Sequence, residues 1–285
     1  MSTSFDIWPF IKMHGLGNDF VVVDARMCEF AVNPERASII ANRRRGIGCD
    51  QLIIMRPSTT ADVFMEIWNA DGSRVGACGN ATRCIGKLIL SETGQQQITI
   101  ETDAGILTAE TAENGIRVNM GLARLNWDEI PLAHESPTDT IVHSFGTNTG
   151  THGTDVGTLG TPGCVNMGNP HAVFFVDDVE SVALSTFGPE LEHDALFPER
   201  ANVSVAELLD GNIIRLRVWE RGAGITEACG TAACASVVAA TRRGLIDRKA
   251  TVRLDGGDLL VEWLADGTVQ MAGPAELVYT GECSL

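Results

Sequence analysis

Short runs of apolar and β-branched residues, separated by turn residues, dominate the first part of the chain. Phe20–Asp24, Leu52–Met55 and Val63–Trp68 are such runs, and each follows a segment of small or polar residues. These runs predict β-strands, because branched side chains fit the pleated surface of a sheet. The same pattern predicts further strands at Ile98–Glu101, Ile106–Ala109, Ile116–Met120, Val252–Leu254, Leu259–Trp263 and Val269–Ala272.

Two stretches instead show the three-to-four-residue spacing of a helix face. Between Gly79 and Gly94, apolar residues recur at positions 81, 84, 85, 88 and 89, and Gly94 predicts the end of that helix. Positions 233, 236, 237 and 240 form a stripe of small residues, followed by two arginines and Gly244. Positive charge in the last turn and a glycine after it are typical of a helix C-terminus. Pro34 predicts a further short helix over residues 34–44.

The helix predicted between Gly79 and Gly94 and the helix predicted around positions 233–240 both begin in a phrase that occurs twice. Residues 65–81 read MEIWNADGSRVGACGNA, and residues 216–232 read LRVWERGAGITEACGTA. At an offset of 151 residues, without a gap, the phrases share a tryptophan, an Ala-Cys-Gly triplet and a final alanine. This period is far too long for a solenoid, so it predicts two related domains in the chain of 285 residues.

The pattern also indicates the fold class. Many strands around a few helices in each half predict α+β domains with one enclosed helix each. Residues 134–162 are rich in Thr, Gly, Ser and His and are interpreted as a linker between the halves or a long exposed hairpin. Hydrophobic residues make up 44% of the chain, which is enough for a sizeable core in each half.

Charge and cysteine content narrow the functional classes. A formal net charge of −16 argues against nucleic acid and anionic membranes as partners. The first residues do not form a signal peptide and no apolar run is long enough to span a bilayer, so a cytoplasmic protein is expected. The eight cysteines are therefore expected to be free thiols, and their spacing predicts no metal site.

Cys78 and Cys229 differ from the other cysteines because each precedes a glycine at the predicted start of a helix. The positive end of a helix is expected to lower the thiol pKa, and its first N–H groups can bind a carboxylate. Those groups would belong to Gly79, Asn80, Gly230 and Thr231. Two such helix starts facing one amino acid would place a sulfur on either side of its α-carbon. This arrangement predicts a two-base racemase, in which one thiolate removes the α-proton and the opposite thiol returns one.

No cofactor is expected for this chemistry. No Gly-x-Gly-x-x-Gly follows a strand, and Lys12, Lys87 and Lys249 adjoin no phosphate loop of the kind that pyridoxal phosphate needs. Five other cysteines are interpreted as small core residues, namely Cys28, Cys84, Cys164, Cys234 and Cys283. A non-catalytic amino-acid-binding module and a protein whose thiols cycle through a disulfide are the alternatives from other functional classes.

Five longer motifs resemble those of the diaminopimelate epimerase family. They are MHGLGNDFVVVD (13–24), GIGCDQLI (46–53), WNADGSRVGACGNATRC (68–84), NMGNPHAVFFVDD (166–178) and ERGAGITEACGTAACA (220–235). The resemblance implies a cofactor-independent isomerase that interconverts LL- and meso-diaminopimelate for lysine and cell-wall synthesis, and often a homodimer. It implies two pseudo-symmetric α/β domains, each a barrel-like, mostly antiparallel sheet around a central helix. The first would comprise residues 1–130 with a final strand in 276–285, and the second residues 131–275.

The same resemblance implies roles for individual residues. Cys78 and Cys229 would be the acid and base, with His171 and Glu220 tuning the thiols. Substrate contacts are implied at Asn18, Gln51, Asn69, Gly79, Asn80, Asn169, Asn202, Glu220, Arg221, Gly230 and Thr231. The guanidinium of Arg221 suits the second carboxylate of a long substrate.

The motifs depart from the usual family pattern at four positions, none of which is an implied acid, base or substrate contact. These positions are Ala81, Thr82, Ile225 and Ala232. A proline or hydroxyproline racemase-like enzyme shares the short Cys-Gly elements and is the rival enzyme. Arg221 and the amide side chains favour a substrate with two charged ends instead.

Overall fold

The computed structural model describes residues 7–143, 145 and 159–284 and divides the chain into two compact units. Unit 1 comprises Met1–Asn119 and Ala272–Leu285, and unit 2 comprises Met120–Met271. The chain leaves unit 1 within one strand and returns within another. The bounds that the family resemblance implied, after residues 130 and 275, lie within unit 2 and within the returning segment of unit 1, and not at these two strands.

Unit 1 contains two helices, nine strands and the last two residues of a tenth strand, β16, among its described residues. Its helices are α1 (Pro34–Ala41) and α2 (Gly79–Thr93). Its strands are β1 (Ile7–Gly15), β2 (Asn18–Asp24), β3 (Gln51–Arg56), β4 (Val63–Asn69), β5 (Arg74–Val75), β6 (Gln97–Thr102), β7 (Gly105–Ala112), β8 (Gly115–Leu122, which runs into unit 2), β16 (Thr268–Gly273, which enters from unit 2) and β17 (Glu276–Ser284).

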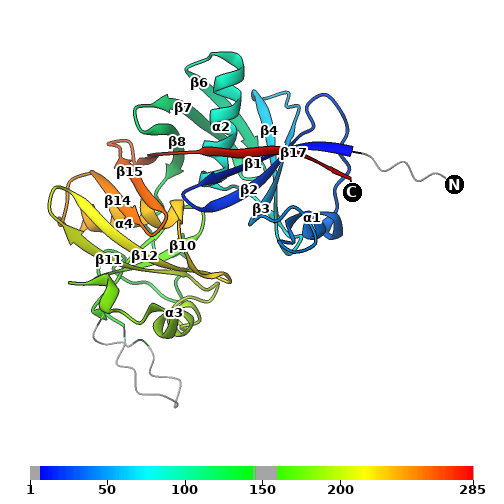
Figure 1. Ribbon diagram of the computed structural model, residues 1–285. Coiled ribbons are helices and arrows are strands. Elements are labelled where there is room, and N and C mark those ends of the chain that lie inside the picture. The colour runs from blue at the N-terminus through cyan, green and yellow to red at the C-terminus, as the bar shows by residue number, and fades with distance from the viewer. Residues whose placement is uncertain (1–6, 144, 146–158, 285) are drawn as a thin grey trace. The chain divides into compact units, whose positions relative to one another are not determined.

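Helix α2 is the buried centre of unit 1. It packs against β1, β6 and β7, and Figure 1 shows it among these strands. Gly86 permits the closest approach, because a Cβ there would lie 2.8 Å from the Cβ of Ala109 on β7. The helix ends at Gly94, whose φ of 71° is in the left-handed region that favours glycine. The predicted helix and its end are therefore confirmed.

Helix α1 covers another part of the same sheet. Pro34 is in its first turn, and the Asn33 side chain accepts a hydrogen bond from Arg36 N (2.8 Å). Alternate residues of β2 and β3 pack with Phe30 and Ile40 in one hydrophobic cluster, and their neighbours are also buried. Burial on both faces explains why these strands are continuous apolar runs in the sequence.

Unit 2 repeats this plan with a second buried helix. Its helices are α3 (Leu184–Glu192), α4 (Gly230–Arg242) and a 3₁₀ turn, η2 (Val179–Ser181). Its strands are β9 (Gly163–Asn166), β10 (Pro170–Phe175), β11 (Asn202–Leu209), β12 (Ile213–Glu220), β13 (Gly224–Thr226), β14 (Lys249–Leu254) and β15 (Gly257–Trp263). Helix α4 packs against β9, β10 and β15, and the small residues of its stripe allow this contact on several sides. Figure 1 labels α4 among the strands of unit 2.

The strand registers reproduce the sequence repeat. In unit 1, β2 and β3 are parallel with Phe20 opposite Gln51, and β3 and β4 are antiparallel with Leu52 opposite Trp68. In unit 2, β10 and β11 are parallel with His171 opposite Asn202, and β11 and β12 are antiparallel with Val203 opposite Trp219. Each pair is related to its counterpart by the offset of 151 residues. The duplication therefore extends from the sequence to the pairing of individual residues.

The interpretation of residues 134–162 as a linker between the halves is wrong for the part that is described. Residues 134–143 and 159–162 belong to unit 2. Ile141 is buried in the unit 2 core, and its N–H donates to Pro162 O (2.9 Å). The tip of the expected hairpin, at 144 and 146–158, lies outside the described residues.

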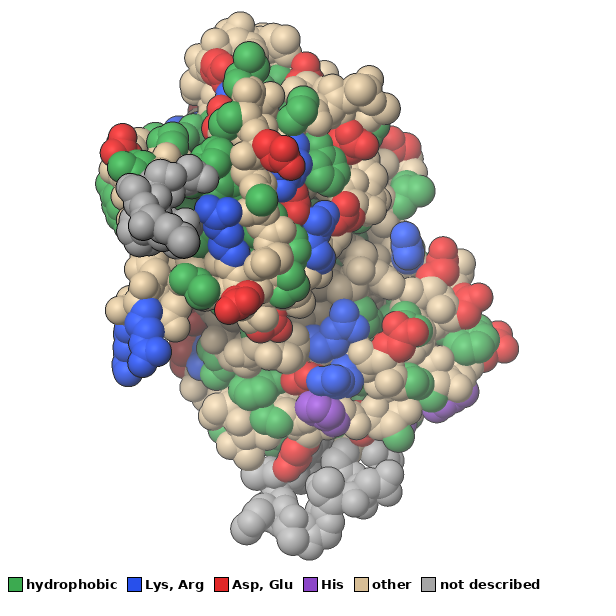
Figure 2. Space-filling view, turned by 90° about the vertical axis from the view of Figure 1, so that its right-hand side faces the viewer, with side chains coloured by type: hydrophobic (Ala, Val, Ile, Leu, Met, Phe, Trp, Pro, Cys, Tyr) green, Lys and Arg blue, Asp and Glu red, His purple; other side chains and the backbone are tan. Residues whose placement is uncertain are grey.

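Two surface observations bear on partners. Among the helices of the described ranges, none combines the length and apolar character needed to cross a bilayer. On the face that Figure 2 shows, acidic and basic side chains are interspersed, and neither gathers in one large patch. On this face the charge of −16 is therefore not concentrated in one place.

Candidate active site

Cys78 and Cys229 occupy equivalent positions in the two units. Each is the N-cap of its helix, Cys78 of α2 and Cys229 of α4, with φ and ψ of −146° and 115° for Cys78 and −127° and 108° for Cys229. Neither helix has an acidic residue in its first turn. The first N–H groups of a helix point beyond its end and favour an anion, so each unit presents a thiol at a helix end with positive partial charge. Gly79 and Gly230 are the first helical residues, as predicted.

In unit 1 the half-buried Cys78 lies against two asparagines. Its Sγ lies 4.0 Å from Asn18 Oδ1, which also accepts a hydrogen bond from Asn80 Nδ2 (3.0 Å). The Cys78 carbonyl closes the first helical turn by accepting from Thr82 N (2.9 Å) and Thr82 Oγ1 (2.8 Å). Three sequence-predicted residues therefore lie together, Asn18 from β2 and Cys78 and Asn80 from the start of α2. Thr82, a departure from the family pattern, stabilises this helix start.

A charged network that the sequence did not predict holds Asn18. Asp50 accepts hydrogen bonds from Asn18 Nδ2 (3.0 Å) and from Asp19 N (3.1 Å), while Asp50 N donates to Asp19 Oδ1 (2.8 Å). Lys12 and Arg43 both pair with Asp19. Burial alone would raise the pKa of Asp19, but the hydrogen bonds from Arg43 and Lys12 outweigh it and hold that pKa below its ordinary value of 3.8. The sequence feature that could have predicted this network is the pair of acidic residues inside two motifs, Asp19 in GNDF and Asp50 in GCDQ.

Gln51 and Asn69 form a second pair in unit 1. They lie opposite each other on β3 and β4, and Gln51 Nε2 donates to Asn69 Oδ1 (3.0 Å). Asn69 Nδ2 in turn donates to Ser73 Oγ (3.0 Å) in the turn that follows β4. These amides are fixed by the sheet register and by each other.

In unit 2 the thiol of Cys229 is buried. Cys229 is 5% exposed, and its Sγ lies 3.5 Å from Thr231 Oγ1. Burial, and after it the negative charge of Glu220, raises the pKa of this thiol well above its ordinary value. The expectation of a lowered thiol pKa is therefore wrong for Cys229. The partial charge of a helix end does not offset the loss of solvation when the neighbouring charged group is a carboxylate.

Glu220 is itself fixed next to this thiol. It ends β12, and Thr226 Oγ1 on the adjacent β13 donates to its carboxylate. Ile225, the departure between them, is 43% exposed, whereas Ala232 is buried in the first turn of α4. The backbone of Ala232 is a hydrogen-bond partner of the Cys229 thiol, a contact that does not depend on its side chain.

The remaining unit 2 residues gather around the start of β10 and β11. His171 is fully buried, and its Nε2 lies 2.9 Å from Asn169 Oδ1. Burial and then the positive charge of Arg221 lower the pKa of His171 from 6.5 to about 3, so the ring is neutral at pH 7. Asn202 Nδ2 donates to Pro170 O (2.9 Å), and Asn202 Oδ1 accepts from Arg221 N (2.9 Å). The structure thus brings Asn169, His171, Asn202 and Arg221 together within this unit.

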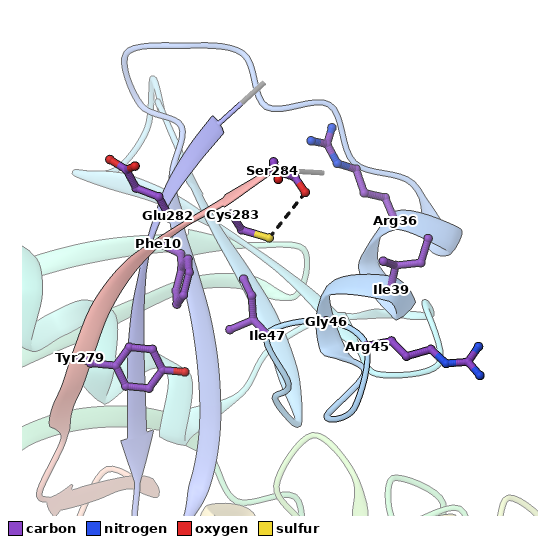
Figure 3. Close-up of a pocket in the computed structure, with 10 residues that line it drawn as sticks. All are labelled: Phe10, Arg36, Ile39, Arg45, Gly46, Ile47, Tyr279, Glu282, Cys283 and Ser284. Atoms are coloured by element: carbon purple, nitrogen blue, oxygen red, sulfur yellow. Dashed lines mark hydrogen bonds between the residues drawn. The ribbon is translucent and has the colours of Figure 1, made fainter. Parts of the chain in front are cut away.

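A hollow elsewhere in unit 1 is not this site. It has a volume of about 810 Å³, and Phe10 and Tyr279 face it from β1 and β17, while the guanidinium group of Arg45 points away (Figure 3). None of its ten lining residues is a predicted site residue. In the ranges described, His, Cys, Asp and Glu side chains form no group of three or more that could hold a metal ion.

Comparison with known proteins agrees with the geometry. The model of the diaminopimelate epimerase family matches residues 10–126 and 163–278. A diaminopimelate epimerase from Rhodospirillum centenum is 51% identical over 278 residues, covering 96% of this chain and 92% of that protein. One from Phenylobacterium zucineum is 51% identical over 278 residues, covering 96% of this chain and 97% of the relative.

Solved structures share the fold at low sequence identity. A hydroxyproline epimerase from Agrobacterium vitis matches with a TM-score of 0.65 at 14% identity, covering 97% of this chain and 91% of that one. A PhzF-family protein from Bacillus anthracis matches with a TM-score of 0.66 at 18% identity, covering 98% and 100%. The predicted two-part, sheet-dominated α/β fold is confirmed. Because the family model matches more than half of the residues and relatives at half identity span nearly all of them, the chain belongs to the diaminopimelate epimerase family.

Proposed function

We propose that this chain is an isomerase that interconverts LL- and meso-diaminopimelate by moving one α-proton. The observation that carries the proposal is the pair of equivalent N-cap cysteines, Cys78 and Cys229, each at the start of the buried helix of its unit. The identity of the substrate is inferred from relatives named diaminopimelate epimerase, which are 51% identical to this chain. The reaction requires both thiols to reach opposite faces of one α-carbon.

The two thiols would act in turn as base and acid. In one direction Cys78 as the thiolate removes the α-proton, and Cys229 gives its own proton to the opposite face. The raised pKa of Cys229 supports its part as the protonated partner at the start of this step. At the end Cys78 is a thiol and Cys229 a thiolate, which is the starting state of the reverse reaction. Proton transfer of this kind uses no cofactor.

The reacting carboxylate would be held by the N–H groups of Gly79-Asn80 and Gly230-Thr231. These helix starts stabilise the negative charge that spreads onto the carboxylate when the α-proton leaves. The second amino-acid centre would be bound by Arg221 and by the amide side chains of Asn18, Gln51, Asn69, Asn169 and Asn202. His171 and Glu220 would tune the thiols, Glu220 through its contact with Cys229.

The decisive experiment is incubation of the purified protein with LL-diaminopimelate in deuterated water. We expect deuterium at one α-carbon and formation of the meso isomer. Cys78→Ser and Cys229→Ser should each lower the rate by orders of magnitude, because a hydroxyl is a far weaker acid than a thiol. The exposed Cys28→Ser is the matched control and should retain full activity. Exchange with hydroxyproline alone would assign the chain to the rival substrate, and near-normal turnover in either active-site variant would refute the two-thiol mechanism.

We further propose that the protein works in the cytoplasm as a homodimer. Lysine and cell-wall precursors are made there, which supports the compartment. Leu277, Val278 and Tyr279 on β17 are 49%, 54% and 45% exposed, and such a strand is a natural contact for a second copy. Light scattering should give twice the chain mass of 30.5 kDa, and the monomer mass for Leu277→Asp. A monomeric wild-type protein would refute the dimer but not the reaction, and cell fractionation tests the compartment.

A further inference from the structure

Glu192 is a buried carboxylate that the proposed reaction does not use. It is the last residue of α3, and its side chain is 4% exposed. Its Oε2 accepts a hydrogen bond from Trp219 Nε1 (2.8 Å), and its Oε1 accepts one from Gly222 N (3.1 Å). The more exposed Arg200 lies 3.5 Å from Oε1. A buried carboxylate with this many donors is costly to disturb, because loss of one acceptor oxygen leaves the partly buried N–H of Trp219 or Gly222 without its partner.

The donor Gly222 lies in the turn that carries Glu220 and Arg221. Ala223 N closes this turn by donating to Glu220 O (3.0 Å), and Gly222 has a φ of 76°. Positive φ at the third position is typical of a type II turn, which favours glycine there. Arg221 N donates to Asn202 Oδ1 (2.9 Å), so Glu192 and Asn202 hold adjacent N–H groups of one turn. The backbone under the Arg221 guanidinium is thereby fixed from two sides.

The repeat supplies an independent observation in unit 1. Trp68, the counterpart of Trp219, also donates its Nε1–H to a buried carboxylate, Glu66 Oε1 (2.8 Å). Glu66 also pairs with Arg74 Nη1 (2.8 Å) on β5, the strand after the equivalent turn. The offset of 151 places Glu66 on Arg217, not on Glu192. In each unit a carboxylate therefore anchors the equivalent tryptophan and the hairpin that precedes the cysteine. The two carboxylates, Glu66 and Glu192, are not related by the repeat.

We propose that Glu192 is a positioning residue for substrate binding, acting through the Glu220–Ala223 turn on Arg221. The proposal rests on the proposed function, in which Arg221 binds the second carboxylate of the substrate. Glu220 is held separately by Thr226 on β13, so the group next to the Cys229 thiol keeps its place when the turn loosens. Disturbing Glu192 should therefore weaken binding more than it slows proton transfer.

Glu192→Gln tests this with little change in shape, since it replaces one carboxylate oxygen with an NH₂ group that faces an N–H donor. We expect KM for diaminopimelate to rise about tenfold, with kcat changed by less than about threefold. Glu190→Gln makes the same change two residues earlier on α3 and should leave both constants at their wild-type values. A purely structural role would lower the active fraction, and hence apparent kcat, without raising KM.

Trp219→Phe provides a second variant, because it removes one donor to Glu192 and leaves the carboxylate itself intact. It should raise KM in the same direction but by a smaller factor, about threefold. If Glu192→Gln does not fold, this variant decides the question. Unchanged KM in the folded variants, or a fall in kcat alone, would overturn the positioning role. Wild-type protein that does not epimerise diaminopimelate would instead overturn the proposed function, so the two failures are distinguishable.

Discussion

The buried His171 should make unit 2 lose stability as the pH falls below neutrality. Burial and the charge of Arg221 lower its pKa from 6.5 to about 3, so the folded state binds no proton there between these values while the unfolded state does. The contribution to stability is therefore complete above pH 6.5 and is lost as the pH falls from 6.5 towards 3. At about 1.4 kcal/mol per pH unit, the loss between pH 8 and pH 5 is about 2 kcal/mol.

The perturbation that tests this is His171→Phe. The offset of 151 places His171 on Phe20, which is also fully buried and has the same register with its neighbouring parallel strand. A phenyl ring therefore has a precedent at this position in the other unit. The variant loses the contact with Asn169 at every pH, but it should not lose a further 2 kcal/mol or so on acidification.

Urea unfolding followed by tryptophan fluorescence at pH 8, 6.5 and 5 measures the difference. The quantity of interest is the change with pH in the gap between wild type and variant, because other titrating groups cancel in it. His134→Gln, at an exposed histidine of the same unit, is the matched control and should follow the wild type. Parallel loss of stability in wild type and His171→Phe, or an NMR titration of His171 near pH 6.5, would refute the reasoning.

Two further substitutions test the packing and the charge network. Gly188→Ala should destabilise unit 2 by about 1–2 kcal/mol, although alanine gains about 1 kcal/mol in helix propensity. Its Cβ would lie 2.4 Å from the Trp219 ring, and this overpacking costs more than the propensity gain. Urea unfolding measures the change in stability, and a variant as stable as the wild type would show that the ring moves freely. Asp19→Asn should cost about 2 kcal/mol at pH 7 by leaving Lys12 and Arg43 without their shared carboxylate. Because the folded pKa of Asp19 is lowered, this deficit should shrink as the pH falls below 3.8, and a gap that stays constant between pH 7 and pH 3 would contradict the assignment.

Helix α3 shows where local pattern fails. Gly188 and Pro189 lie inside it, and both residues argue against a helix when read from the sequence. The helix forms because Leu184 and Leu191 enter the unit 2 core, and Gly188 lets the helix backbone lie on Trp219. Tertiary packing here outweighs a propensity cost of a few kcal/mol.

Strands β9, β10 and β11 are a second example. Sequence patterns predicted no strands between residues 163 and 209, although Ala172–Phe175 is a plain apolar run. These strands are buried almost throughout, so alternation between polar and apolar residues is absent and a run of this length fits either a strand or a helix. The parallel pairing of β10 with β11 joins segments about thirty residues apart and leaves no local signature.

The sequence by itself determined the features that depend on neighbouring residues. The start and end of α2 follow from local spacing, because caps and helix faces act within a few residues. The 151-residue repeat, with a Cys-Gly pair in each copy, is visible by comparing the two halves of the sequence with each other. Only the tertiary structure decided the pKa of Cys229, the network around Asp19 and the anchoring of Trp219 by Glu192. Each of these three features depends on the exclusion of solvent and on side chains from distant segments of the chain. Tertiary packing sets these two conditions, and a local sequence pattern does not reveal them.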